Sequence, residues 1–355
     1  MINRRILLVT GTLILIGVAG IILFELRKEP EIEALPAYSP TSGWRTAKPS
    51  EVRLNSEVLA DMVSDIRASS TQTRSSLVVK DGYLIIEEYY NGYGRNDEQQ
   101  LYSGTKSVVS TLIGIAIADG KIKGVEERLP DLLPEESMEP WMEDITLENL
   151  LMMSAGLPGD DWLYNFSGLN EMLAAPDPLR YALTRQKVFE PGSRFEYTDA
   201  VSHILSCIIS EKTGMSAAEY AEEKLFSPLG ITDYSWDSDA QGRNWGYAQL
   251  KLRAVDMAKI GLLFLRGGTW DGNQVVPASW VQEATKHRID ANLLDGYGYQ
   301  WWVDDGWYTA LGYKGQFIMV FPRLNIVAVF TGGTPETYNY NIRLANRFII
   351  PAAEG

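Results

Sequence analysis

The pattern of apolar and polar positions predicts strands near both ends of the main part of the chain. The runs Ser76–Lys80 and Tyr83–Tyr90 are rich in apolar, β-branched and aromatic residues, and the Asp81-Gly82 pair between them is typical of a tight hairpin turn. Strand signals return towards the C-terminus over Tyr299–Val303, Trp307–Leu311, Phe317–Phe321 and Ile326–Thr331. Strands at both ends predict one antiparallel sheet to which both ends of the domain contribute.

The section between these strands is mainly helical in its pattern. The run Val108–Ile117 is apolar nearly all round and stops at Gly120, which is typical of a buried helix. Further helices are expected over Thr146–Met153, Ala200–Glu211, Ala217–Leu225 and Ala254–Leu265, and a last one over about Glu336–Ile349. The expected fold class is therefore α/β of the α+β kind: a sheet flanked by helices, with an inserted all-helical lobe at approximately residues 100–265.

The first residues carry a different pattern. Residues 6–24 contain no charge and follow Arg4 and Arg5, and this run is long enough to cross a bilayer as a helix. A cleaved signal peptide and an uncleaved signal anchor both fit, but the length of the run favours the anchor. We expect a transmembrane helix in residues 1–26, a proline-containing tether over 27–50 and a main domain over 51–355.

The basic residues before the apolar run place the N-terminus in the cytoplasm. The main domain is then expected outside the inner or plasma membrane, on a single-pass anchor. Secretion to the periplasm after cleavage is the alternative. The formal net charge of −14 argues against nucleic acid as a partner and against contact of the main domain with anionic membranes.

Few side chains are suited to metal or histidine chemistry. The single cysteine, Cys207, lies in an apolar run and is expected to be a buried structural thiol. The two histidines, His203 and His287, share no motif with a serine or an acid, and no His/Cys cluster has zinc spacing. We therefore expect chemistry without a metal or cofactor.

One Ser-x-x-Lys occurs in the chain, at Ser103 and Lys106, directly before the predicted buried helix. Residues three apart share a helix face, so the serine hydroxyl and the lysine amine are expected to meet. The helix N-terminus favours an oxyanion near Ser103, and burial disfavours the charged lysine, which makes Lys106 a base candidate near neutral pH. Chance alone supplies such a tetrad in a chain of this length, so its meaning depends on other motifs.

Five further segments accompany it in order: residues 145–157, 191–199, 227–231, 256–261 and 297–302. Together with the tetrad, they resemble the serine β-lactamase and penicillin-binding protein superfamily in its class C-like branch, over roughly residues 50–350. That branch includes carboxylesterases, D-aminopeptidases and 6-aminohexanoate-dimer hydrolases. The resemblance implies a hydrolase that works through an acyl-enzyme, with Ser103 as nucleophile and Lys106 as base.

Tyr197-Thr198-Asp199 occupies the place of the superfamily's Tyr-x-Asn element. The resemblance implies that Tyr197 shuttles the serine proton to the leaving group, provided that Lys106 lowers its pKa. Without the other motifs, Tyr197 is simply a turn residue and Asp199 a helix cap. Asp199 departs from the usual Asn; its carboxylate is expected to favour protonated Lys106 and to repel anionic substrates. Turnover of β-lactams is therefore less expected than that of a neutral ester or amide.

The third element is expected at Tyr313-Lys314-Gly315-Gln316, on an edge strand. The resemblance implies an oxyanion hole made by the Ser103 and Gln316 amides, with Gly315 letting the backbone approach the substrate. Tyr313 stands where a carboxylate-binding lysine is usual. Lys314 would partly replace that lysine, but its side chain is expected to point to the other strand face. An ordinary edge strand is the alternative interpretation. The literal Lys-Thr-Gly at residues 212–214 is rejected because it ends a predicted helix.

Two other groups are open to interpretation. Trp301, Trp302, Trp307 and Tyr308 either line an acyl pocket or, as is commoner, belong to the core. Asp160-Asp161-Trp162 is expected to be a solvated acidic loop.

The predicted function is a serine hydrolase of the carboxylesterase or amidase kind. Its partners would be a small ester, amide or short peptide substrate and, through the N-terminal helix, a membrane. The alternatives are a non-hydrolytic penicillin-binding or sensor module of the cell envelope, a D-Ala-D-Ala carboxypeptidase or a β-lactamase.

Overall fold

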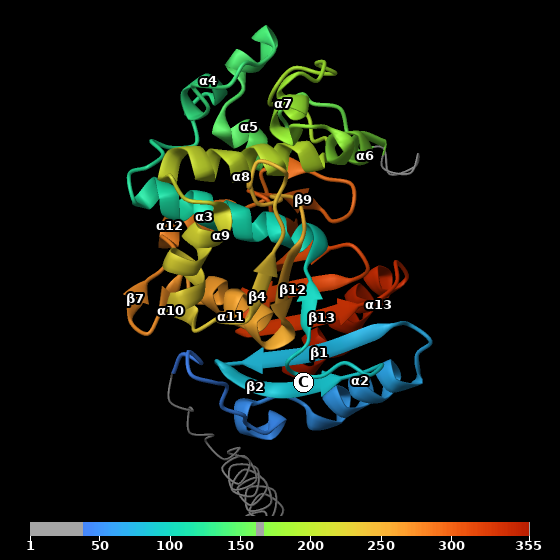
Figure 1. Ribbon diagram of the computed structural model, residues 1–355. Helices are drawn as coiled ribbons and strands as arrows, with labels where there is room; N and C mark the ends of the chain where they lie inside the picture. Colours follow the sequence, from blue (N-terminus) through green and yellow to red (C-terminus); the bar gives the residue numbers. More distant parts are fainter. Residues whose placement is uncertain (1–37, 161–166, 355) are drawn as a thin grey trace, which may run out of the picture.

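The computed structural model describes residues 38–160 and 167–354, which form two lobes (Figure 1). A mainly helical lobe lies at the top of the view, and a lobe built on one large sheet lies below it. The two ends of the described chain both lie in the sheet lobe. The expected mixture of an antiparallel sheet from both ends and helices between them is confirmed.

In the described residues the large sheet has eight strands in the order β2-β1-β13-β12-β11-β10-β9-β8. Every neighbouring pair is antiparallel, and β1 lies beside the last strand, β13, so strands from the two ends of the domain pair near the β2 edge of the sheet. The strands are β1 (Thr73–Lys80), β2 (Tyr83–Tyr89), β8 (Ile289–Asp290), β9 (Gly296–Tyr297), β10 (Trp302–Asp304), β11 (Trp307–Gly312), β12 (Gln316–Phe321) and β13 (Ile326–Gly332).

Helices cover both faces of this sheet. Successive residues of a strand point to opposite faces: Phe317 of β12 contacts Tyr338 of α13 (Thr337–Leu344), whereas Ile318 lies against Gly261 of α11 (Ala254–Leu265). A Cβ at Gly261 would lie 2.5 Å from a methyl group of Val327, so the glycine lets α11 lie close to the sheet. Burial on both faces explains why β12 and β13 are nearly continuous apolar runs.

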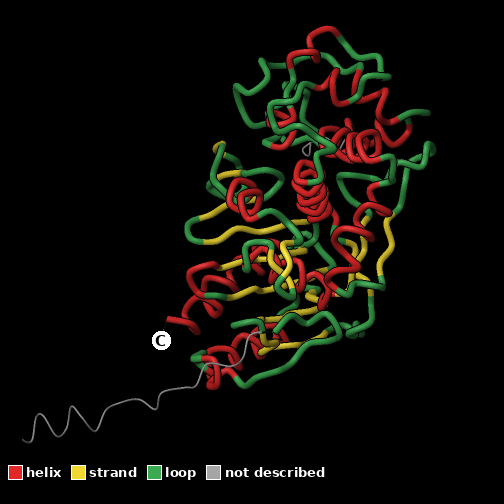
Figure 2. Tube along the Cα trace, turned by 90° about the vertical axis from the view of Figure 1, so that its left-hand side faces the viewer, coloured by secondary structure: helices red, strands yellow, loops and turns green. Residues whose placement is uncertain are grey.

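The inserted lobe is not all-helical, which corrects the expectation for residues 100–265. Three short strands form a second antiparallel sheet in the order β3 (Glu98–Gln100), β5 (Leu250–Arg253), β4 (Tyr234–Trp236). Strands of three or four residues are too short to show a clear alternation. Helix α11 packs on the large sheet, whereas α3 (Thr105–Ala118) and α8 (Asp199–Thr213) pack against each other below the short helices at the top of Figure 1. In Figure 2 the upper end of the molecule consists of helices and loops, and the strands lie below it.

The remaining α-helices of the described chain surround these elements. They are α2 (Ser56–Ala68), α4 (Leu129–Leu132), α5 (Leu147–Leu151), α6 (Ser167–Ala174), α7 (Pro178–Leu183), α9 (Ala217–Ala221), α10 (Ser227–Leu229), α12 (Ala278–Ala284) and α14 (Ile350–Glu354). The strand expected over Tyr299–Val303 begins only at Trp302. Gln300 has a left-handed φ of 60°, and both its backbone and side-chain N–H groups donate to the Leu151 carbonyl of α5 rather than to a strand.

Of the predicted tether, residues 27–50, the structure describes residues 38–50. Residues 38–50 lie on the domain: the Trp44 indole donates to the Val255 carbonyl at 3.1 Å, and the Thr41 hydroxyl donates to Asp271 at 2.6 Å. The predicted transmembrane helix lies outside the described residues, so it stays a prediction. Within residues 38–160 and 167–354, no helix has the length and apolarity needed to span a bilayer.

Candidate active site

Ser103 lies where a single 3₁₀ turn, Tyr102–Gly104, leads into α3, as the sequence predicted. Tyr102 has a left-handed φ of 48°, a conformation that side chains other than glycine rarely adopt. Gly312, at the end of β11, lies so close that a Cβ on it would be 1.9 Å from the Leu101 carbonyl oxygen. This close approach holds the Tyr102–Gly104 turn against the end of β11.

Lys106 is buried and makes three polar contacts. Its Nζ donates to Ser103 Oγ at 3.1 Å, to Asp199 Oδ1 at 2.5 Å and to the Tyr247 carbonyl at 2.9 Å. The predicted meeting of Ser103 and Lys106 is therefore present. An amine that donates to three acceptors is a charged ammonium, and Lys106 forms an ion pair with Asp199. The same ion pair neutralises the Asp199 charge, so this geometry does not support the expected repulsion of anionic substrates.

Tyr197 completes the group around Ser103. Its hydroxyl hydrogen-bonds to Ser103, and its ring lies beneath Lys106 Nζ, 4.9 Å from the ring centre. Burial raises the pKa of Tyr197 well above its ordinary value, and the Asp199 carboxylate raises it further. The expectation that Lys106 lowers this pKa is wrong, because the lysine faces the ring and its charge is paired with Asp199. The Tyr197 hydroxyl is therefore held in its neutral form.

Asp160 is a member of this group that sequence reasoning missed. Its side chain is buried, and it accepts hydrogen bonds from the Asp199 backbone N–H and, at 3.2 Å, from the Thr198 hydroxyl. It thus caps the N-terminus of α8 from another part of the chain. Burial raises the pKa of Asp160 to about 7, and the charge of Asp199 adds to the rise. The expected solvated loop is wrong for Asp160, while Asp161 and Trp162 lie outside the described residues.

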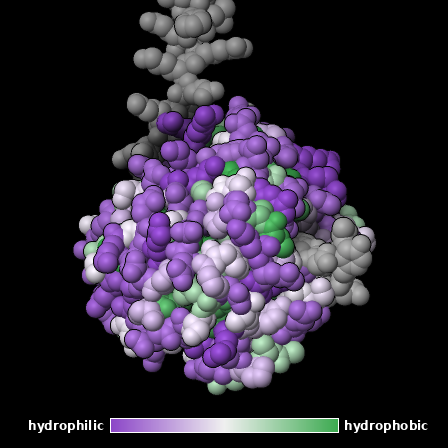
Figure 3. Space-filling view, turned by 90° about the horizontal axis from the view of Figure 1, so that it is seen from above, coloured by the Kyte–Doolittle hydropathy of each residue, from purple (hydrophilic) through white to green (hydrophobic). Residues whose placement is uncertain are grey.

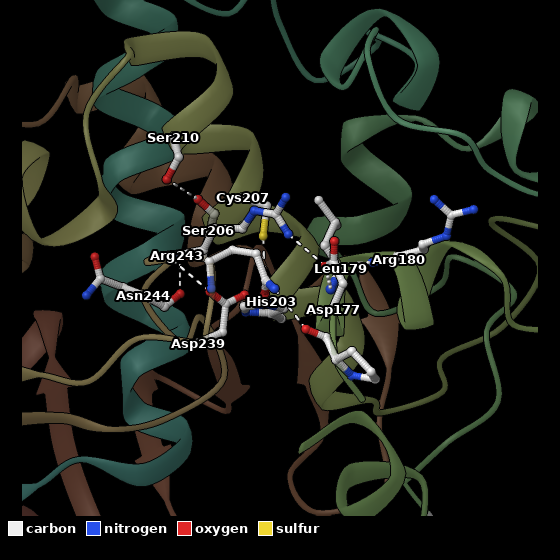
Figure 4. A network of polar contacts seen from close by, with 12 residues as sticks. Asp177, Leu179, Arg180, His203, Ser206, Cys207, Ser210, Asp239, Arg243 and Asn244 are labelled. Carbon is white, nitrogen blue, oxygen red and sulfur yellow. Dashed lines mark hydrogen bonds and ion pairs between the residues drawn. The ribbon is translucent and has the colours of Figure 1, made fainter. Parts of the chain in front are cut away.

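A buried polar network beside α8 holds the segment that carries Tyr247 (Figure 4). Ser206 of α8 donates to the Asn244 carbonyl at 2.7 Å, and His203 Nε2 lies 3.3 Å from Asp239. Arg243, in the same segment, forms an ion pair with Asp177 at 2.8 Å. Because these contacts fix residues 237–245, the neighbouring carbonyl of Tyr247 reaches Lys106.

Among the described residues, this network contains neither a second candidate serine active site nor a metal site. Cys207 is buried as expected, with its sulfur 3.8 Å from His203. In the part of the chain that the structure describes, no three His, Cys, Asp or Glu side chains are grouped as metal ligands would be.

A cavity of about 260 Å³ opens beside Ser103 and Tyr197. Its other lining residues are Leu293, Trp302, Leu311, Gly312, Tyr313, Lys314, Pro335 and Tyr338. Of the aromatic cluster weighed from the sequence, only Trp302 lines the cavity, where it stacks on Tyr197; Trp301, Trp307 and Tyr308 are buried. The cavity wall is mainly apolar, so it fits the apolar part of a small substrate.

The third predicted element is a turn and not an edge strand. Strand β11 ends at Gly312 and pairs there with Gln316, the first residue of β12, so Tyr313, Lys314 and Gly315 connect the two strands. Tyr313 lines the cavity, as a substrate-binding residue should. Lys314 lines it as well, so the expectation that it points to the other strand face is wrong. Residue 314 lies in a turn with a left-handed φ of 64°, where the alternation of a strand does not apply.

Gly315 and Gln316 support this turn. Gly315 has a φ of 81°, and its close neighbour is α13: a Cβ on it would lie 2.9 Å from the backbone of Thr337. The buried Gln316 side chain donates to the Gly332 carbonyl at 2.8 Å, and Gln316 is not among the described residues that line the cavity. The oxyanion role of the Gln316 amide stays a prediction.

Comparisons with known proteins agree with this arrangement. The Beta-lactamase family model matches residues 63–344. A curated relative, the 6-aminohexanoate-dimer hydrolase of Paenarthrobacter ureafaciens, is 24% identical over 316 residues, which cover 82% of this chain and 80% of that protein.

Solved structures show the same fold. A putative 6-aminohexanoate-dimer hydrolase from Bacillus anthracis matches with a TM-score of 0.73 and 21% identity, covering 90% of this chain and 89% of that one. A family VIII carboxylesterase matches with a TM-score of 0.66 and 16% identity. The match covers 83% of this chain and 96% of that one. Because the family model spans well over half of the residues, the chain belongs to the β-lactamase family, within the superfamily of serine β-lactamases and penicillin-binding proteins.

Proposed function

We propose that this protein is a serine hydrolase that cleaves a small ester or amide through an acyl-enzyme. The observation that carries the proposal is the placement of Ser103 Oγ, 3.1 Å from Lys106 Nζ and hydrogen-bonded to Tyr197, on the wall of an apolar cavity. A pure binding module needs no such set of a nucleophile, an amine and a hydroxyl in mutual contact. The printed names of the relatives, a dimer hydrolase and a carboxylesterase, agree with amide and ester substrates.

The proposed reaction uses the ion pair and the neutral tyrosine in turn. Lys106 passes a proton to Asp199 and then takes the proton of Ser103 as its Oγ attacks the substrate carbonyl. Tyr197 gives its hydroxyl proton to the leaving oxygen or nitrogen, and Lys106 reprotonates it. Water then attacks the acyl-enzyme, which releases the acid and returns a proton to Ser103. The Ser103 amide, near the N-terminus of α3, is the proposed first oxyanion donor.

The membrane anchor is part of the same proposal. Residues 6–24 would cross the inner or plasma membrane once, with the catalytic domain outside the cytoplasm; release to the periplasm after cleavage is the alternative.

The test combines covalent labelling with turnover. We expect a fluorophosphonate probe to label the wild-type protein and short-chain 4-nitrophenyl esters to be hydrolysed. The Ser103→Ala variant should lose both signals, while Ser110→Ala, in the buried middle of α3, serves as the matched control.

Two results would contradict the proposal. Failure of both the probe and the esters to react would exclude a hydrolase of this kind, as would equal turnover by wild type and Ser103→Ala. Labelling by a fluorescent penicillin without turnover of esters, amides, D-Ala-D-Ala peptides or nitrocefin would support a penicillin-binding or sensor module instead.

A further inference from the structure

Gln300 is a buried polar residue that the proposed reaction does not use. Only 1% of its surface is exposed, and it lies just before β10 with a left-handed φ of 60°, a conformation that side chains other than glycine rarely adopt. A strained position of this kind persists only where the surrounding contacts fix it. The elements that those contacts join therefore indicate the role of the residue.

The contacts of Gln300 join the two helices that carry the ion pair of the site. Ser107, which follows Lys106 on α3, donates through its hydroxyl to the Gln300 backbone carbonyl at 2.7 Å. Ser202, three residues after Asp199 on α8, donates to the Gln300 side-chain oxygen at 2.8 Å. Both serines are buried, so loss of either bond leaves a buried polar group without its partner.

The remaining polar groups of Gln300 anchor it to α5. Its side-chain amide nitrogen donates to the Leu150 carbonyl at 3.2 Å and to the Leu151 carbonyl at 2.9 Å, and its backbone N–H also donates to Leu151 at 3.0 Å. These carbonyls lie at the end of α5, where a helix leaves acceptors without a partner. The opposite orientation of the amide would place its oxygen against them, so the contacts fix one orientation.

The chain after Gln300 leads directly into the active site. Trp302, two residues further on, lines the cavity and stacks on Tyr197 with 5.9 Å between the ring centres. One buried residue thus connects α3, α8 and the strand whose indole packs on the Tyr197 ring.

We propose that Gln300 is a positioning residue, which sets how α3 and α8 lie against each other at the active site. It thereby keeps Lys106 in contact with both Ser103 and Asp199. Gln300 is not among the described residues that line the cavity, so it acts through the two buried serines. The inference rests on the proposed hydrolase. A space-filling role would need only a side chain of this size, whereas the positioning role needs its hydrogen bonds.

Removing these hydrogen bonds tests the role. Ser202→Ala deletes the hydroxyl that α8 donates to Gln300, and Gln300→Met keeps the size of the side chain but loses its amide. We expect kcat for neutral short-chain 4-nitrophenyl esters to fall about tenfold in each variant, with KM changed much less, because a small misplacement of the catalytic groups slows the chemical step. The rate at which a fluorophosphonate labels Ser103 should fall by the same factor.

Ser75→Ala is the matched control. Ser75 is buried in β1, and its hydroxyl forms a hydrogen bond with Thr331 of β13 at 2.7 Å, so this variant also loses one buried bond between two elements. We expect the urea midpoints of Ser75→Ala and Ser202→Ala to fall by similar amounts. With kinetics measured below the unfolding transition, Ser75→Ala should keep the wild-type kcat.

Combining the two changes at the contact identifies it as the cause. In the double variant of Ser202→Ala and Gln300→Met, kcat should fall no further than in Gln300→Met alone, because both changes remove the same hydrogen bond. Full additivity of the two losses would contradict a shared contact.

The inference is overturned if Ser202→Ala keeps the wild-type kcat and labelling rate, or if Ser75→Ala lowers kcat as much as Ser202→Ala does. Should Gln300→Met fail to fold, Ser202→Ala and its control decide the question. These outcomes leave the hydrolase itself intact, because wild-type turnover still depends on Ser103. Absence of Ser103-dependent turnover in wild type would instead contradict the proposed function.

Discussion

The proton state of Tyr197 decides how the site can work. The Tyr197 hydroxyl forms a hydrogen bond with Ser103. Burial and the nearby Asp199 carboxylate raise the pKa of Tyr197. A tyrosine held neutral cannot act as a free phenolate base, so its proposed role is to deliver a proton to the leaving group.

The change Tyr197→Phe removes this hydroxyl and keeps the ring that stacks on Trp302. We expect kcat for 4-nitrophenyl esters to fall by about 10²- to 10⁴-fold, with KM changed much less, because the lost contact acts in proton transfer. Steady-state kinetics with the neutral esters measure both quantities.

Tyr297→Phe is the matched control. Tyr297 is buried in the same aromatic cluster, 6.5 Å from the Tyr197 ring, but it is not among the described residues that line the cavity. Equal losses in the two variants would mean that the Tyr197 hydroxyl contributes only to packing, and would remove it from the mechanism.

The residues of this site differ in how far the sequence predicted them. Ser103 and Lys106 could be predicted because one helical turn brings them together, and Tyr197 and Asp199 because they share a motif. Asp160 and the Tyr247 carbonyl could not. A backbone carbonyl leaves no mark in a sequence, and nothing local shows that an acid in a loop becomes buried against a helix N-terminus.

At the scale of elements, Asp199 is the first residue of α8, and Asp160 caps the N-terminus of that helix. The helix N-terminus favours a charged Asp160, but burial and the neighbouring Asp199 favour the neutral acid, and the pKa of Asp160 rises to about 7. In an unfolded chain an aspartic acid loses its proton near pH 4. Between about pH 4 and 7 the folded protein therefore binds a proton that the unfolded chain has lost, and its stability falls as pH rises through that window.

The variant Asp160→Asn should lose this pH dependence. An amide of the same shape can accept from the Asp199 N–H and donate to Thr198, but it does not titrate. We expect the free energy of unfolding of wild type to fall relative to the variant by up to about 1.4 kcal/mol per pH unit between pH 5 and 7, and the difference to level off above that range. Urea unfolding at several pH values measures it.

Asp144→Asn controls for the loss of one negative charge, since the Asp144 side chain is exposed and pairs only with the exposed Arg128. The same pH slope in wild type and in Asp160→Asn would show that the buried carboxyl does not titrate in this window.

Elements with a long, regular pattern were predicted well. Helix α11 has the expected bounds, Ala254–Leu265, and β13 differs by one residue at its end. The small sheet of β3, β4 and β5 was missed because its strands are short and paired across distant parts of the chain. The sequence predicts a strand over Tyr313–Gly315 because apolar strands lie on both sides, whereas the structure has a turn there.

At the scale of the whole molecule, the N-terminal segment 38–50 ties parts of the sheet lobe together. Thr46 forms a β-bridge with Leu84 of β2, and the Trp44 indole donates to Val255 of α11. Thr41 accepts a hydrogen bond from the buried Trp270 indole at 2.7 Å. These specific contacts hold the segment on the sheet lobe. The face seen from above, which Figure 3 shows, is mostly hydrophilic with small separate hydrophobic patches.

Two shortened chains test this role. A chain that begins at residue 51 should be less stable than one that begins at residue 38 by on the order of 2–4 kcal/mol, because it loses these hydrogen bonds, the packing of Trp44 and the partner of the Trp270 N–H. Urea midpoints at one pH compare the two. Both chains should still hydrolyse neutral esters below the transition, since no residue of 38–50 lines the cavity. Equal midpoints would show that residues 38–50 lie on the surface without stabilising the domain. The domain boundary expected at residue 51 would then also be the boundary of the stable unit.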